Sequence, residues 1–267
     1  MSDSVKHAAR SVDSSPALRA LARGGYVASG VVHLLIGAIV VSVALGGRGQ
    51  TDQSGAFKAI ARAPLGQAVL WVLAVLLAAL GLYHLVQCFL ASGDSAADRW
   101  KERASQAGRA VVFAALGVVA ATVAMGARPN GDRAAENASR DVLGLPGGPV
   151  LLALIGAGVL VGGVVFAVRG VRQSFTKKLT LPAGRVGRGV TMLGVVGYVA
   201  EGIALAIVGV LMIVAAVSAD PKKAGGLDAA VHTLLTLPFG PFITAAAGIG
   251  FVAYGVFLFF RARYAKL

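Results

Sequence analysis

Hydrophobic residues dominate the chain in six long runs, and each run is long enough to cross a lipid bilayer. The most uniform run is Gly189–Ser218, which contains a single charged residue, Glu201. Five further runs lie at residues 24–46, 66–91, 106–127, 148–168 and 238–260. An α-helix of about 20 apolar residues spans a hydrocarbon core of ~30 Å. The pattern therefore predicts an all-α membrane protein with six transmembrane helices.

The polar segments between these runs differ in their basic content, and the difference alternates along the chain. Residues 1–23, 92–105, 169–188 and 261–267, together with Arg109, hold 17 of the 25 Lys and Arg residues. By the positive-inside rule this basic set is predicted to be cytoplasmic, which places both termini inside the cell. Residues 1–15 are polar, so we expect the first run, rather than a cleaved signal peptide, to direct insertion.

Composition supports this class of protein and narrows its partners. The chain is 57% hydrophobic and 14% charged, whereas soluble domains average roughly 25% charged residues. The net charge of +13 is explained by topology and by anionic lipid headgroups, so membrane lipids are the predicted partners and no nucleic acid is needed. Cys88 is the only cysteine, which excludes a disulfide within the chain and a Cys cluster for metal.

The chain also contains three copies of one pattern. A proline, a glycine two residues later and a glycine fifteen residues after that recur as Pro64, Gly66 and Gly81, as Pro146, Gly148 and Gly163, and as Pro238, Gly240 and Gly255. Upstream of each proline, Gly37, Gly117 and Gly209 match one another. The pattern predicts a tail at 1–23 and three repeats at 24–92, 99–179 and 184–264, each with an outward helix, an outer loop and an inward helix whose first turn carries Pro-x-Gly.

Two spans per copy give all three copies the same orientation, because an even number of crossings returns the chain to the same side. The copies are therefore parallel repeats related by rotation about the membrane normal, which excludes an inverted-repeat transporter. We predict three hairpins around one axis with quasi-threefold symmetry. The recurring small residues, including the Gly158 and Gly162 pair, suit close approach of helices.

With these repeats the chain resembles a known family, the actinobacterial membrane proteins of domain-of-unknown-function family 1206. The resemblance covers roughly residues 20–264 and rests on the Gly-Tyr pairs at 25–26 and 197–198 and on the Pro-x-Gly pattern with its later glycine before an aromatic residue. Copy two departs from it, since it lacks the Gly-Tyr pair. The resemblance implies a protein of the bacterial inner (plasma) membrane and implies no activity.

Glu201 is the first candidate for chemistry, because a charged side chain at a helix centre costs ~2.5–3.5 kcal/mol on insertion scales. Aligning the repeat glycines places Glu201 opposite Arg109 and Ser29, and equivalent positions should lie at equal depth. That depth is ~24 Å from the outer end of the helix, in the cytoplasmic third of the membrane. We predict that Glu201 pairs with Arg109, as an ion pair that fixes helix register or as a proton or ion relay; separate snorkelling of the two side chains is the third alternative.

His33 and His84 are the histidines inside the predicted spans. They lie ~18 Å and ~27 Å from the outer ends of their helices, and this offset is too large for the two faces of one haem. The equivalent positions in the other copies are apolar or aromatic: Phe113, Leu205, Phe166 and Leu258. We expect hydrogen-bonded packing histidines, with His84 as a second potential partner of Glu201, and we predict neither a cofactor nor a metal.

A small polar cavity open to the cytoplasm is a further hypothesis. The alternative explanation is that the aromatic residues anchor the helices at the membrane interface. The residues that suggest the cavity are polar or aromatic and lie in the inner halves of spans 1, 2, 5 and 6: Tyr26, Tyr83, Gln87, Cys88, Tyr198 and Tyr254. The acidic residues of the outer loop 128–147 are expected to form a solvated, flexible face.

No nucleotide-binding, hydrolase or metalloprotease pattern is present, so no catalytic residue is predicted. The leading hypothesis is a non-enzymatic structural or accessory membrane component that binds lipid, a partner protein or a second copy of itself. The alternative is a small transporter or channel with a polar site in the cytoplasmic half, formed by Glu201, Arg109, Ser29, His84 and His33. A membrane enzyme or redox subunit is the third hypothesis.

Overall fold

Six long helices and three short ones form the fold in the part of the chain that the structure describes. The structure is a computed structural model and describes residues 16–90 and 95–266. The long helices are α2 (Pro16–Ala44), α4 (Gly66–Leu90), α5 (Ala96–Ala124), α7 (Gly148–Val171), α8 (Arg185–Ser218) and α10 (Gly240–Tyr264). All six are long and apolar enough to cross a membrane, which confirms the predicted multi-pass architecture. Residues 1–15 of the predicted tail lie outside the described residues, and residues 16–23 belong to α2.

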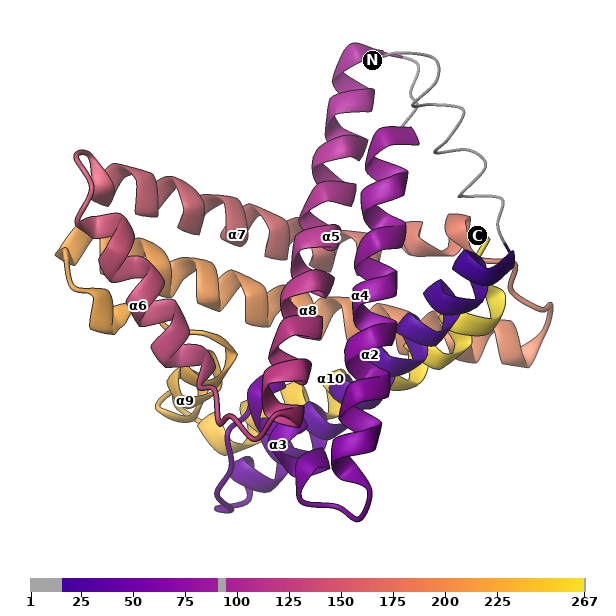
Figure 1. The fold of residues 1–267 in the computed structure, drawn as a ribbon, viewed down its shortest axis with the longest axis horizontal. Helices are drawn as coiled ribbons and strands as arrows, with labels where there is room; N and C mark the ends of the chain where they lie inside the picture. The colour runs from indigo at the N-terminus through magenta and orange to yellow at the C-terminus, as the bar shows by residue number, and fades with distance from the viewer. Residues whose placement is uncertain (1–15, 91–94, 267) are drawn as a thin grey trace.

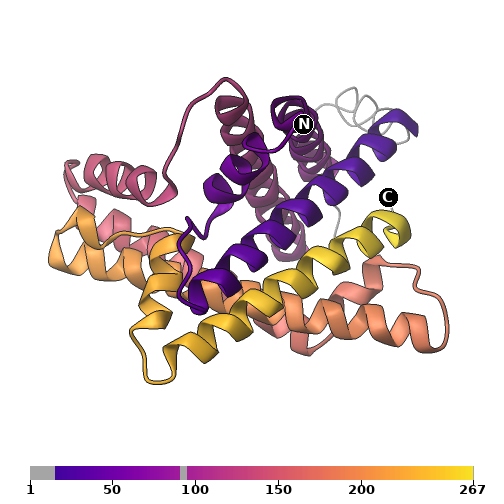
Figure 2. The same cartoon turned by 90° about the horizontal axis from the view of Figure 1, so that it is seen from below.

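The long helices pack as three antiparallel pairs, and each pair joins two copies of the repeat. The closest pairs are α4 with α5, α7 with α8, and α10 with α2, as Figure 1 shows. The second helix of one copy therefore packs against the first helix of the next, and α10 with α2 closes the cycle (Figure 2). The closest contacts therefore lie between copies, whereas the contacts of α2 with α4 and of α8 with α10 lie within a copy.

The repeat glycines lie at the crossings of these pairs. A Cβ atom added to Gly37 would lie 2.7 Å from the Gly248 carbonyl oxygen, and one added to Gly202 would lie 2.6 Å from the Ala167 amide nitrogen. Contacts this short exclude any side chain, so the matched glycines let paired backbones approach each other. Gly158 and Gly162, by contrast, have nothing within 4 Å and lie on the exposed face of α7, so they do not form a crossing within this chain.

The Pro-x-Gly sequence forms the same turn in each copy. In copy one, the amide of Gly66 donates to the Ala63 carbonyl over 2.9 Å, and Leu65 between them has φ of +60°. A proline followed by a residue with positive φ defines a type II turn. The proline therefore precedes the helix instead of lying in its first turn, which corrects the prediction. A Cβ on Gly66 would overlap the Ile60 carbonyl oxygen, so this turn needs glycine.

The threefold arrangement is incomplete in copy two. Helix α2 contacts α4 and α8 contacts α10, but α5 and α7, the two spans of copy two, make no comparable contact. In Figure 1 the α4–α5 pair diverges from the α7–α8 pair. The most apolar window of α7 is 17% buried, against 56% for α2, so α2 lies nearer the centre and α7 at the periphery.

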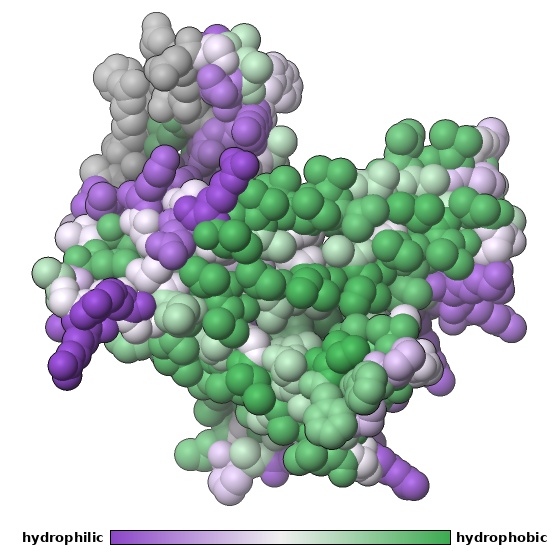
Figure 3. Space-filling view, turned by 180° about the vertical axis from the view of Figure 1, so that it is seen from behind, coloured by the Kyte–Doolittle hydropathy of each residue, from purple (hydrophilic) through white to green (hydrophobic). Residues whose placement is uncertain are grey.

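The two ends of the bundle differ in structure. The loop end carries the short helices α3 (Gln53–Ala61), α6 (Gly131–Leu143) and α9 (Leu227–Leu235), with the 3-10 turn η2 (Pro221–Lys223). The opposite end, here called the terminal end, carries the start of α2, the end of α10 and the 3-10 turn η1 (Ser174–Lys178). Residues 131–143 of the outer loop 128–147, for which we expected a flexible, solvated face, form helix α6. Figure 3 shows a broad hydrophobic surface between hydrophilic margins, as expected of a bilayer-spanning protein.

One aspartate from each copy links the three copies at the loop end. Asp132 Oδ1 accepts the Gly226 amide of copy three over 2.7 Å, and Asp228 Oδ1 of copy three accepts the Thr51 amide of copy one over 2.7 Å. Asp52 of copy one caps its own helix, accepting the Gly55 amide over 2.8 Å, and lies against Gly131 of copy two. We call Asp52, Asp132 and Asp228 the aspartate ring.

Candidate functional site

A cationic cavity opens at the terminal end of the bundle, where α4 and α5 meet α2, α10 and the η1 turn. Its volume is about 420 Å³. The residues that line it come from all three copies and are Tyr26, Tyr83, His84, Gln87, Glu102, Gln106, Arg109, Lys177, Lys178, Arg261, Ala265 and Lys266. Five of these side chains are cationic and one is a carboxylate, so the cavity carries a strong positive charge.

Arg109 and Arg261 are less exposed than the three lysines. Both lie in helices that could span a membrane, with Arg261 one residue beyond the apolar run predicted at 238–260. Arg261 donates from Nη1 to the Tyr198 hydroxyl over 3.1 Å, and its guanidinium lies 4.7 Å from the centre of the Tyr26 ring. Neither arginine takes part in an ion pair between described residues. Two half-buried guanidinium groups that form no ion pair are costly in a membrane, because each charge is partly removed from water. The contacts with Tyr198 and Tyr26 offset part of this cost for Arg261.

A chain of polar contacts runs from the cavity floor to its mouth. His84 Nδ1 lies 2.8 Å from Gln106 Oε1, Gln106 Nε2 donates to Glu102 Oε1 over 2.7 Å, and the same oxygen lies 3.2 Å from Lys178 Nζ. His84 is 2% exposed, and its ring stacks on Phe113 with centroids 5.5 Å apart. Its Nε2 atom is buried and has no hydrogen-bond partner among the described residues.

Glu201 lies outside this cavity, in contact with another histidine. Its Oε2 atom is 3.6 Å from His33 Nε2, while His33 Nδ1 is 2.7 Å from the Ser29 carbonyl oxygen. The predicted ion pair between Glu201 and Arg109 is not among the ion pairs of the described residues, and His84 does not replace Arg109 as the partner. The alignment of the repeats gives Glu201 and Arg109 equivalent positions along their helices. In the fold, α8, which carries Glu201, packs on α10, and α10 packs on α2. Arg109 lies on α5, which is not part of this group.

The five predicted site residues thus fall into two groups. Arg109 and His84 line the cavity, whereas Ser29, His33 and Glu201 meet near Tyr254, whose ring centre is 5.0 Å from that of His33.

Of the six residues that suggested a polar cavity, three line it: Tyr26, Tyr83 and Gln87. Tyr198 and Tyr254 make an edge-to-face contact with ring centres 5.4 Å apart. Cys88 donates to the Arg103 carbonyl over 3.5 Å.

Sequence reasoning did not assign the other seven lining residues to the cavity: Glu102, Gln106, Lys177, Lys178, Arg261, Ala265 and Lys266. The repeat contained a signal for two of them. By the same alignment, Gln106 is equivalent to Tyr26 and Tyr198, and Arg261 is equivalent to Arg169 and Gln87. Polar or aromatic residues at two equivalent sets of positions indicate a shared polar region at one end of the bundle.

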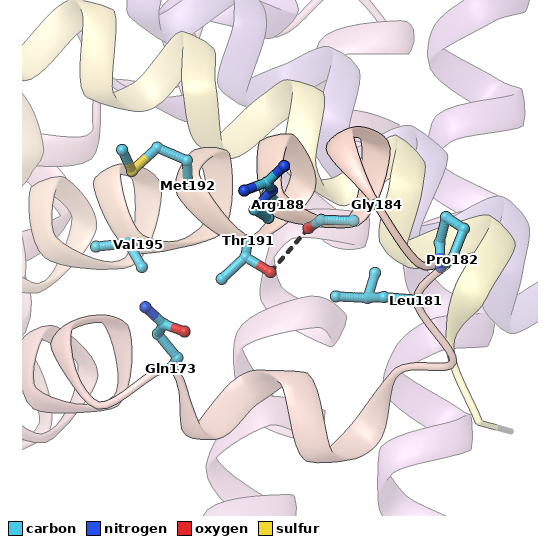
Figure 4. Close-up of a pocket in the computed structure, with 9 residues that line it drawn as sticks. Gln173, Leu181, Pro182, Gly184, Arg188, Thr191, Met192 and Val195 are labelled. Carbon is cyan, nitrogen blue, oxygen red and sulfur yellow. Dashed lines mark hydrogen bonds between the residues drawn. The ribbon is translucent and has the colours of Figure 1, made fainter.

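A second cavity, of about 440 Å³, lies between the α7–α8 connection and the first turns of α8 (Figure 4). Arg188 is the only charged residue among those lining it, and the Thr191 hydroxyl donates to the Gly187 carbonyl of its own helix over 2.9 Å. It has no buried polar atom without a partner, so it is the weaker candidate. Among residues 16–90 and 95–266, no group of three or more His, Cys, Asp or Glu side chains could hold a metal ion.

The fold and the cavity define a polytopic membrane protein of three parallel two-helix repeats with a charged cavity at one end. The family described as Domain of Unknown Function (DUF1206) matches residues 24–91, 104–173 and 196–265, and the chain belongs to this family. It is also similar to the uncharacterized protein YxxB of Bacillus subtilis (strain 168), with 25% identity over 258 residues, covering 94% of this chain and 93% of the relative. No solved structure matches the chain.

Proposed function

We propose that this protein is a non-enzymatic component of the bacterial inner membrane that binds an anionic ligand, foremost an anionic lipid headgroup, in the cationic cavity. The observation that carries this proposal is the pair Arg109 and Arg261, which share the cavity and form no ion pair with a carboxylate of the described residues. A bound anion would compensate both charges and form charge-assisted hydrogen bonds with them.

The place of the cavity favours a lipid source. It lies at the terminal end of the spans, beside the basic residues Lys177, Lys178 and Lys266. The positive-inside rule assigns this end to the cytoplasm, where leaflets rich in anionic lipid attract basic segments by ~1 kcal/mol per charge. A headgroup at the membrane surface could enter the cavity laterally while its acyl chains stay in the bilayer.

The test is stabilisation of the purified full chain by lipid. The unfolding temperature is measured in nanodiscs of neutral phosphatidylcholine and in nanodiscs that also contain roughly 20–30% of an anionic phospholipid. The anionic lipid gives the membrane a negative surface potential, which attracts basic sites. We expect anionic lipid to raise the unfolding temperature of the wild type. A double variant, Arg109→Gln with Arg261→Gln, should lose most of this rise.

The matched control is Arg263→Gln, which removes an exposed arginine from the same helix end without altering the cavity. Equal stabilisation of the wild type by neutral and anionic nanodiscs would contradict the proposal. So would an undiminished anionic effect in the double variant.

Transport is the second candidate function, and Glu201 with His33 is the observation that favours it. Glu201 Oε2 is buried without a hydrogen-bond partner and lies 3.6 Å from His33 Nε2. A carboxylate and an imidazole at this separation can share one proton, which is the arrangement of a proton-relay site. Proteoliposomes with a pH-sensitive dye inside would reveal proton flux, and Glu201→Gln should abolish it. Absence of flux from wild-type liposomes excludes this candidate.

A further inference from the structure

We infer that the cavity selects a phosphate group that carries a proton, and that the Nε2 atom of His84 accepts a hydrogen bond from this P–OH group. The inference rests on the proposed function and specifies its ligand class. The two sources of such a group are the phosphomonoester headgroup of phosphatidic acid and free inorganic phosphate. A fully deprotonated anion such as sulfate, or the anionic phosphodiester of a lipid without a headgroup hydroxyl, lacks the required donor.

The direction of each hydrogen bond in the polar chain fixes the role of His84. Glu102 Oε1 lies within bonding distance of both Gln106 Nε2 and Lys178 Nζ, and a carboxylate oxygen accepts from both. The amide nitrogen of Gln106 is therefore turned toward Glu102, and its carbonyl oxygen faces His84. That oxygen can only accept, so His84 donates from Nδ1 over 2.8 Å.

A neutral imidazole has one ring proton, and in His84 that proton is on Nδ1. Its Nε2 atom consequently holds a lone pair and acts as an acceptor. A second proton on the ring is disfavoured by the nearby guanidinium groups of Arg109 and Arg261, which line the same cavity. The Nε2 atom is buried and has no partner among the described residues, so a ligand that donates a hydrogen bond to it gains binding energy that a ligand without a donor does not.

Both features together define the ligand. The arginines require negative charge, and Nε2 requires a hydrogen-bond donor on the same small group. Protonated phosphate supplies oxygens for the arginines and a P–OH for His84, whereas sulfate would place an oxygen lone pair against the lone pair of Nε2. Sites with a buried acceptor reject analogues that lack the donor, since the acceptor then remains unpaired.

The test measures binding of two probe pairs to the full chain in neutral detergent or nanodiscs at pH 7. The soluble pair is inorganic phosphate and sulfate, followed by calorimetry. The lipid pair is phosphatidic acid and phosphatidylmethanol, which differ in the P–OH group, followed by the unfolding temperature. We expect phosphate to bind at least about tenfold more tightly than sulfate, as one hydrogen bond to a charged group implies.

His84→Phe removes the acceptor and installs the residue of the equivalent position in copy two, Phe166. We expect the ratio of phosphate to sulfate affinity to fall toward one in this variant. His33→Phe is the matched control, because it also replaces a buried histidine with the residue of copy two but lies outside the cavity. Its ratio should equal that of the wild type.

The outcomes separate the inference from the proposed function. Equal binding of phosphate and sulfate by the wild type overturns the inference, whether or not His84→Phe folds, while leaving anion binding intact. Failure of all four probes to bind overturns the proposed function. If the protein prefers phosphate to sulfate but binds phosphatidic acid and phosphatidylmethanol equally, the inference is supported and the ligand is free phosphate. If it also prefers phosphatidic acid to phosphatidylmethanol, the ligand is the lipid headgroup.

Discussion

The two ends of the helix bundle both bring together polar and charged residues from all three copies, but the ends differ in how those residues are paired within the chain. At the loop end, the carboxylates of the aspartate ring accept backbone amides of Gly55, Gly226 and Thr51 over 2.7 to 2.8 Å. At the terminal end, Arg109 and Arg261 form no ion pair with a described carboxylate, and His84 Nε2 has no partner there.

This difference separates charges that hold the fold together from charges that point to a ligand. A carboxylate bonded to amides near a helix N-terminus is stabilised by the helix dipole and contributes to folding. An arginine in the membrane that has no acid beside it lowers stability until an anion binds. Charge-removing substitutions at the two ends should therefore affect different properties of the protein.

The largest loss of stability is expected from a substitution at a helix crossing, because both ends of the bundle depend on the packing of the long helices. Gly202→Val should destabilise the protein by about 3 kcal/mol or more, because a Cβ there would lie 2.6 Å from backbone atoms of α7 that cannot yield. Thermal unfolding in detergent measures this loss. Gly158→Val is the control, since nothing lies within 4 Å of that position, and equal losses in the two variants would contradict the role of the crossing.

The next effect tests the loop end alone. Asp228→Ala removes the acceptor of both the Thr51 amide, at 2.7 Å, and the Thr51 hydroxyl, at 2.6 Å. Since Thr51 is fully buried, its unpaired groups should cost about 2–3 kcal/mol. The unfolding temperature should fall while the affinity of the folded protein for anions stays constant.

Asp141→Ala is the control for this loop-end substitution, because Asp141 is an exposed acid on α6. We expect a change within about 0.5 kcal/mol for it. A loss of anion affinity in Asp228→Ala, measured on folded protein, would mean that the two ends are coupled rather than separate.

The third prediction tests the terminal end alone. Arg109→Gln should reduce anion affinity about tenfold or more, because one charge-assisted hydrogen bond is lost. In the absence of anions its unfolding temperature should equal or exceed that of the wild type, since an uncompensated charge is removed. Calorimetry and thermal unfolding on the same sample check both statements, and a lower unfolding temperature with unchanged affinity would refute them.

The smallest effect concerns pH at the loop end. Burial raises the pKa of Asp52 above its usual value, and nearby Asp228 and Asp132 add to the rise, while hydrogen bonds from Gly55 and Gln50 oppose it. Between the ordinary and the raised pKa the folded state binds more protons than the unfolded state, so this group adds stability as pH falls through that window. Asp52→Asn should flatten this part of the pH profile of unfolding temperature. A profile identical to the wild type would show that another group is responsible.

Much of the architecture was predictable because local sequence patterns report local constraints. The apolar runs fix the spans, since a backbone in lipid must satisfy its own hydrogen bonds and so must be helical. The spacing of Pro64, Gly66 and Gly81, repeated twice, fixes three parallel copies. The need for glycine after proline follows from the turn, although the position of that turn before the helix was not predicted.

The site was only partly predictable. Repeat alignment put Glu201, Arg109 and Ser29 at equivalent positions, and it suggested that opposite charges at equal depth would meet. Equal depth does not specify direction around a helix, and the structure brings Glu201 to His33 instead of Arg109. The acids of loop 128–147, which include Asp132, were expected on a solvated face, because nothing in the sequence identified the distant Gly226 amide from which Asp132 accepts.

The sequence by itself determined the number of spans, the repeat and the glycines that allow close contact, because each depends on hydrophobicity or on spacing within a single helix. Only the tertiary structure decided which helix packs on which. It pairs helices between copies, separates α5 from α7, and thereby assigns partners to some charges and leaves others without one. That choice depends on the summed packing of whole helix faces, which no short stretch of sequence contains.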